Sequence, residues 1–185
     1  MKNLLQQYKP FLLFLGKFLL TYVLLTVIYQ SYLNRFDANK NEVDSFSQLV
    51  ANQTISVLTL FDAEAYNQQH LTEPSIKIIY KGQYISRIIE GCNALSVIIL
   101  FISFIIAFTG KFKRTIVFIL FGSILIHILN IARIALLCMA LYSFPEYEHI
   151  LHGVVFPLVI YGIVFLLWVI WVNKFSLHAT TTAKK

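Results

Sequence analysis

The sequence TIVFILFGSILIHILNIARIALLCMALY covers residues 115–142 and decides the fold class. A helix needs roughly 20 predominantly apolar residues to cross the hydrocarbon core of a bilayer, and this segment is longer than that. Three further apolar segments of comparable length occupy residues 11–34, 91–110 and 150–173. The sequence therefore predicts an all-α integral membrane protein, a single domain over residues 1–185 built as a four-helix transmembrane bundle.

The composition excludes a water-soluble monomer. Apolar residues make up 58% of the chain and charged residues only 13%, whereas an ordinary soluble domain has roughly 25% charged residues. We expect the lipid bilayer to be the main partner of the chain. The net charge of +6 does not indicate nucleic-acid binding, because its distribution follows the predicted membrane ends.

Basic residues flank one set of membrane ends. They are Lys2, Lys9, Lys17, Lys111, Lys113, Arg114, Lys174, Lys184 and Lys185. All nine acidic residues lie in the other two connecting segments, residues 35–90 and 143–149. Cytoplasmic loops carry an excess of lysine and arginine. The pattern therefore predicts that both termini are cytoplasmic and that the two acidic segments are external.

The first apolar segment has a secretory signal peptide as its alternative interpretation, because lysines precede the apolar run. No small-x-small cleavage site follows before Arg35, so we expect a permanent membrane anchor. Two cysteines, Cys92 and Cys138, are too few for a disulfide scaffold.

The external segment, residues 35–90, shows two local patterns. An approximate helical stripe predicts a surface helix lying on the bilayer; its members are Phe46, Leu49, Val50, Val57, Leu58 and Phe61. Residues 76–89, IKIIYKGQYISRII, predict a short β-hairpin that turns at Lys81-Gly82. The hairpin runs directly into Glu90-Gly91-Cys92, so we expect it to form part of the wall of a site at Cys92.

Arg133 is the least ordinary residue of the predicted spans. An arginine inside a membrane helix costs at least ~2.5 to 3.5 kcal/mol on insertion scales, which makes it a functional candidate. The alternative is a structural arginine that binds helix carbonyls together with Asn130, one turn away on the same face. Its helix places Arg133 in the outer half of the bilayer, where it should face protein.

Two further reactive side chains share that side of the membrane. Cys92 begins the second predicted span from outside, and His152 begins the fourth. A helix N-terminus and a nearby arginine both favour the thiolate, which is the attacking form of cysteine. The sequence has no HExxH, paired CxxC or GxSxG motif, which disfavours metalloproteases and rhomboid-like serine proteases. We expect no metal and no organic cofactor.

Three segments, EGCNALS at 90–96, NIARI at 130–134 and HGVVF at 152–156, resemble the exosortase/archaeosortase family. Members are multi-pass cysteine transpeptidases of prokaryotic envelopes, and the small size of this chain resembles the short exosortase branch called type F. The resemblance implies an outward-facing catalytic triad at Cys92, Arg133 and His152. Asn93-Ala94 departs from the Ser-Gly that follows the cysteine in many members.

The resemblance also implies the location and the substrates. It places the chain in the inner membrane of a prokaryotic cell, with its active site facing the periplasm or exterior. Substrates would be exported proteins with a C-terminal motif, a membrane helix and a basic tail. The acyl acceptor would be a lipid or glycan group, or water in simple proteolysis.

Two alternatives come from other functional classes. One is a non-enzymatic membrane assembly subunit, in which Arg133 and His152 form only a buried polar network. The other is a small anion transporter, in which Arg133 attracts the anion. Both predict that replacement of Cys92 is tolerated, whereas a thioester mechanism requires the thiol.

Overall fold

The computed structural model describes residues 2–37, 40–61, 64–108 and 110–175, and the Thr-rich tail with Lys184 and Lys185 lies outside these residues. The longer helices are α1 (Lys2–Leu33), α2 (Ser45–Thr59), α3 (Leu95–Ala107), α4 (Phe112–Ser143) and α6 (Phe156–Ile170). The strands are β1 (Ala65–Gln69), β2 (Ile76–Tyr80) and β3 (Gln83–Ile88). Short elements complete the chain: 3-10 turns at Glu90–Cys92 and Pro145–Tyr147, α5 (Glu148–Ile150), and π turns at Leu151–Val155 and Trp171–Phe175.

Three helical segments are long and apolar enough to cross a membrane: Tyr8–Leu33, Phe112–Ser143 and Pro145–Phe175. The chain is therefore a multi-pass membrane protein. The segment expected at 91–110 is shorter, because α3 has only 13 residues, or about 20 Å at 1.5 Å per residue. A hydrocarbon core is about 30 Å thick, so the fourth pass stays a prediction.

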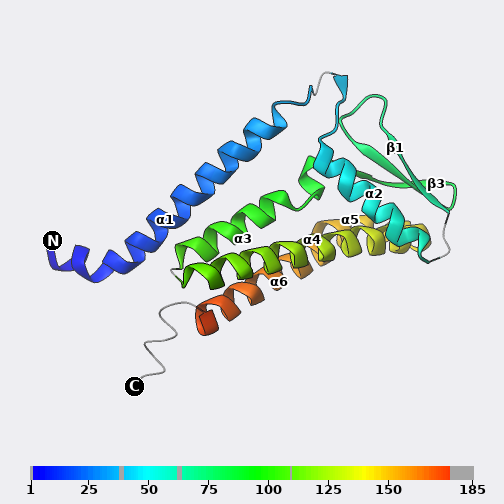
Figure 1. Cartoon of the computed structure of the whole chain (residues 1–185). Helices are drawn as coiled ribbons and strands as arrows, with labels where there is room; N and C mark the ends of the chain where they lie inside the picture. The colour runs from blue at the N-terminus through cyan, green and yellow to red at the C-terminus, as the bar shows by residue number, and fades with distance from the viewer. Residues whose placement is uncertain (1, 38–39, 62–63, 109, 176–185) are drawn as a thin grey trace.

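Helices α3, α4 and α6 run side by side, and α1 packs along α3 (Figure 1). The start of α1 and the end of α6 lie at one end of the bundle, and the sheet lies at the other. Trp171 and Phe101 are fully buried in the bundle core. A Cβ atom at Gly122 would lie 2.3 Å from the Phe101 ring, so only glycine allows α3 and α4 to approach this closely.

The predicted hairpin is confirmed as β2 and β3. Its two-residue turn places both Lys81 (φ 49°) and Gly82 (φ 75°) in the left-handed region, as the tight turns of twisted hairpins require. A third strand, β1, pairs antiparallel with β2 and gives the sheet order β1-β2-β3. Strand β1 was not predicted, because its sequence, AYNQQ, is polar and lacks β-branched residues.

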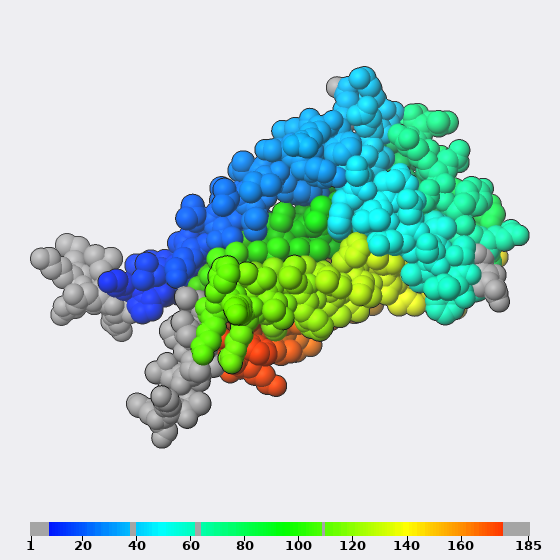
Figure 2. All heavy atoms as spheres, in the orientation of Figure 1, coloured from blue at the N-terminus to red at the C-terminus, as the bar shows by residue number. Residues whose placement is uncertain are grey.

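A helix is present where the surface helix was predicted: α2 is capped by the Asp44 carboxylate, which accepts from the N–H groups of Phe46 and Ser47. The predicted apolar stripe is wrong in part, because Leu49 and Phe61 are exposed. The buried face of α2 packs on the sheet and on α4. That face comprises Ser47, Val50, Ala51, Thr54 and Leu58. The space-filling view shows α2 against the C-terminal part of α4 (Figure 2). One face of this part of α4, including Ile134 and Cys138, is buried against α2 and the sheet, so its apolar character serves protein packing.

Candidate active site

Cys92 ends the 3-10 turn that joins β3 to α3. Its thiol is half-buried and free, and the Cys92 N–H donates to the Ile89 carbonyl at 2.9 Å. The expectation that Cys92 lies in the first turn of the membrane helix is wrong, since α3 begins at Leu95. Because the helix dipole acts mainly within that first turn, Arg133 and not α3 is the main positive group near the sulfur.

A left-handed residue separates Cys92 from α3. Ala94 has φ 63° and ψ 6°, a conformation that costs an L-residue roughly 1–2 kcal/mol and that glycine adopts freely. Many proteins that the motif resembles have Ser-Gly after the cysteine. Their glycine stands at the position of Ala94, where it can adopt this conformation freely. The strained backbone sharply redirects the chain, so Cys92 projects beside α3 instead of continuing it.

Hydrogen bonds hold the Cys92 turn on three sides. Asn130 of α4 donates from Nδ2 to the Cys92 carbonyl at 2.8 Å. The buried Asn93 amide donates to the Tyr29 hydroxyl of α1 and to Ser47 Oγ of α2, both at 3.2 Å. Tyr29 in turn donates to the Glu90 carboxylate. The nucleophile candidate therefore sits on a rigid, polar support inside an apolar protein.

Arg133 lies one turn beyond Asn130 on α4 and is half-buried. Its guanidinium interacts electrostatically with the Cys92 sulfur and with the Tyr161 hydroxyl. Within the described residues it forms no ion pair with a carboxylate, and its Nε atom is buried without a hydrogen-bond partner. A half-buried guanidinium without a carboxylate partner has donors left for a ligand that carries or develops negative charge.

His152 lies in the π turn Leu151–Val155 and is exposed. The π turn has a local cause at Pro157, which has no N–H to bond the Gly153 carbonyl and whose ring crowds that carbonyl. The neighbouring Phe156 N–H bonds the Leu151 carbonyl, five residues back, which widens the turn. Such π turns occur frequently at functional sites.

Two adjoining hollows share the three predicted residues. The hollow nearer the sheet, called the outer hollow, has about 290 Å³ and lies between β3, the C-terminal part of α4 and the segment that contains Glu148. The inner hollow, about 220 Å³, lies between the start of α3, Asn130 and Tyr161. Cys92, Arg133 and His152 line both hollows, which places them on the wall between the two. No hydrogen bond joins the His152 ring to Cys92 in the described part of the chain, so a proton would pass between them through a bound group.

Comparison with known families gives one match over most of the chain. The family model described as Transmembrane exosortase (Exosortase_EpsH) matches residues 8–172. The chain belongs to the transmembrane exosortase family. Family membership suggests a membrane transpeptidase or protease. No curated protein and no solved structure matches this exosortase.

Sequence reasoning missed Tyr161 as a neighbour of the site. On an ideal helix, residues nine apart point in opposite directions, so His152 and Tyr161 should diverge. The π turn takes up one extra residue and turns Tyr161 towards the side of His152. The available signal was compositional: Tyr161 carries the only ionisable side chain of α6.

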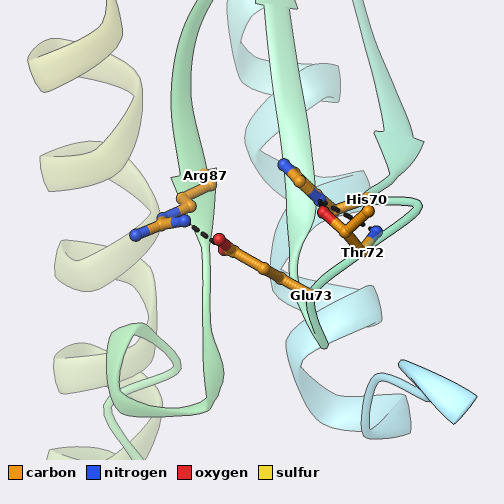
Figure 3. Close-up of polar contacts among 4 residues, drawn as sticks. All are labelled: His70, Thr72, Glu73 and Arg87. Atoms are coloured by element: carbon orange, nitrogen blue, oxygen red, sulfur yellow. Dashed lines mark hydrogen bonds and ion pairs between the residues drawn. The ribbon is translucent and has the colours of Figure 1, made fainter. Parts of the chain in front are cut away.

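The other cysteine and two of the other histidines each contact a neighbouring side chain. Cys138 is buried and its sulfur lies 3.1 Å from Ser86 Oγ, so it forms no disulfide with Cys92. His127 Nε2 lies 2.8 Å from Gln53 Oε1 and thereby ties α4 to α2. His70 bonds the Thr72 hydroxyl in the loop between β1 and β2 (Figure 3). None of the three lines the hollows at Cys92.

Proposed function

We propose that this chain is a membrane-embedded cysteine endopeptidase or transpeptidase that removes C-terminal sorting tails from exported proteins. The observation that carries the proposal is that Cys92, Arg133 and His152, from three separate elements, line the same two hollows. The small size favours a place in the type F branch. No metal or organic cofactor is needed for this chemistry.

In the first step the Cys92 thiolate attacks the carbonyl carbon of the scissile peptide bond. The negative charge that develops on the carbonyl oxygen is stabilised by the Arg133 guanidinium, which has no carboxylate partner among the described residues. The C–N bond then breaks as His152 gives a proton to the leaving amine, and a thioester between Cys92 and the substrate remains.

In the second step an acceptor hydroxyl or amine of a lipid or glycan, or water, attacks the thioester. His152 takes the proton of the acceptor, and the Cys92 thiolate leaves and is ready for another cycle. A substrate anchored by its own membrane helix presents its scissile bond at a fixed depth, which lowers the entropic cost of alignment.

The orientation of the bundle follows from charge. Lys111, Lys113, Arg114 and Lys174 lie at the end of the bundle opposite the sheet. We infer that this end is cytoplasmic, that α3 completes a four-pass topology, and that the hollows face the periplasm or exterior of a prokaryotic inner membrane. The short α3 then holds Cys92 at the outer edge of the bilayer.

The test uses tagged exported proteins from the same organism that end in a membrane helix and a basic cluster. A protein whose tail is removed only in cells that make this chain becomes the reporter. We expect Cys92→Ala, Arg133→Ala and His152→Ala to abolish tail removal at normal protein levels. Cys138→Ala and His149→Ala are matched controls that should retain it.

Two results would overturn the proposed function. One is tail removal by Cys92→Ala, which would favour the assembly-subunit or transporter alternatives. The other is a source organism in which no tail-bearing protein depends on this chain for processing.

A further inference from the structure

We infer that the substrate segment just upstream of the cleaved bond binds as an added β-strand, parallel to β3, along the unpaired edge of the sheet. This inference rests on the proposed function. It assigns the small external sheet a direct role in presenting an extended peptide to Cys92.

The free edge follows from the sheet order. In the order β1-β2-β3, strand β3 pairs only with β2. Apart from this pairing with β2, no backbone hydrogen bond joins Gln83–Ile88 to another segment in the part of the chain that the structure describes. An unpaired edge offers a row of N–H and C=O groups that a further extended chain can bind.

The lining of the outer hollow shows that this edge faces the site. Four consecutive residues line it, Ser86, Arg87, Ile88 and Ile89, together with Cys92. Successive side chains of a strand point to opposite faces of the sheet. A hollow over one face would therefore meet alternate residues, whereas a hollow that meets four consecutive ones lies along the strand edge.

An ion pair braces the strand at this point. Arg87 on β3 binds Glu73, which lies in the loop between β1 and β2 (Figure 3). On the opposite face of the strand, Ile88 is buried in the core shared with α2 and α4. Because Ile88 anchors this end of β3 in the core, the strand edge is preorganised for a peptide before binding.

The direction of pairing follows from the path of the two chains. β3 runs from Gln83 towards Cys92, where the membrane helix follows. In a substrate, the segment before the cleaved bond also runs towards its own membrane helix. Both chains therefore approach the membrane in the same direction, which makes the pairing parallel.

Disulfide cross-linking tests this geometry in an inactive chain without native cysteines, Cys92→Ser with Cys138→Ala. Arg87→Cys or Ile89→Cys is combined with single cysteines placed along the reporter upstream of its cleavage site. We expect Ile89→Cys to cross-link near the cleaved bond and Arg87→Cys to cross-link about two residues further upstream. Gln68→Cys on β1, at the opposite edge of the sheet, is the matched control and should not cross-link.

The outcomes separate this inference from the proposed function. A reversed order of cross-linked positions, equal cross-linking through Gln68→Cys, or no cross-link at β3 while uncut reporter accumulates in the same membranes would each overturn it. Tail removal by Cys92→Ala would instead overturn the proposed function, whatever the cross-linking pattern.

Discussion

Replacement of Asn130 by alanine is expected to slow tail removal without touching the proposed triad. Asn130 is 2% exposed and its Nδ2 donates to the Cys92 carbonyl at 2.8 Å. Its loss leaves a carbonyl without its donor in an apolar setting, which costs about 1–3 kcal/mol. If this cost must be overcome to place the Cys92 sulfur for attack, it adds to the activation free energy. At 1.4 kcal/mol per factor of ten, the rate of tail removal then falls roughly 5- to 150-fold.

The assay measures the rate of tail removal per folded chain in membranes that contain the reporter, together with the thermal unfolding midpoint in detergent. His127→Ala is the matched control, because it removes a bond from the same helix to Gln53 but does not touch Cys92. We expect both variants to lower the midpoint and only Asn130→Ala to lower the rate per folded chain. An Asn130→Ala rate equal to that of the unchanged protein would refute the positioning argument.

Three further substitutions follow from the same geometry. Pro157→Ala restores an N–H that can bond the Gly153 carbonyl, so the π turn should close to an α-turn, rotate His152 by about 100° and reduce tail removal at least tenfold on gels. Ala94→Gly should relieve the left-handed strain and stabilise the protein by about 1 kcal/mol, seen as a higher unfolding midpoint. Tyr161→Phe removes a hydroxyl from the hollow that Arg133 also lines and should slow tail removal while leaving the unfolding midpoint unchanged.

For each of the three substitutions, one result would contradict the prediction. Pro145→Ala, outside the π turn, is the control for the proline variant, and equal effects of the two would argue against the register explanation. A lower midpoint for Ala94→Gly would show that the left-handed turn is not under strain. Tyr142→Phe, at the outer end of α4, controls for loss of a phenol away from the hollows, and equal rates for both tyrosine variants would remove Tyr161 from the site.

Long apolar segments and turn chemistry made much of the fold predictable from sequence. The spans around α1, α4 and α6 follow from hydropathy, and the hairpin follows from Lys81-Gly82 between β-branched runs. The start of α3 was misjudged because the apolar pattern continues through Ala94 and carries no sign of its left-handed backbone. Strand β1 has no sequence pattern typical of a strand. It is a strand because it pairs with β2, and its own composition does not predict it.

The three residues singled out from the sequence line the same two hollows, and their roles stay a prediction, whereas their supports were not predicted. Cys92, Arg133 and His152 stand out as reactive types on one side of a predicted membrane topology. Their hydrogen-bonded supports join residues far apart in sequence, as in the bond from Asn130 to Cys92. Tyr161 depends on a change of helical register at Pro157, which a fixed period of 3.6 residues does not anticipate.

The most direct test of the central claim is capture of the thioester between the reporter and Cys92. Hydroxylamine cleaves thioesters, so membranes with active protein and reporter should yield an N-terminal fragment whose new C-terminus is a hydroxamate by mass spectrometry. We expect this product with the unchanged protein and none of it with Cys92→Ala. Recovery of the fragment only as a free carboxylate in the presence of hydroxylamine, or of the hydroxamate with Cys92→Ala, would contradict it.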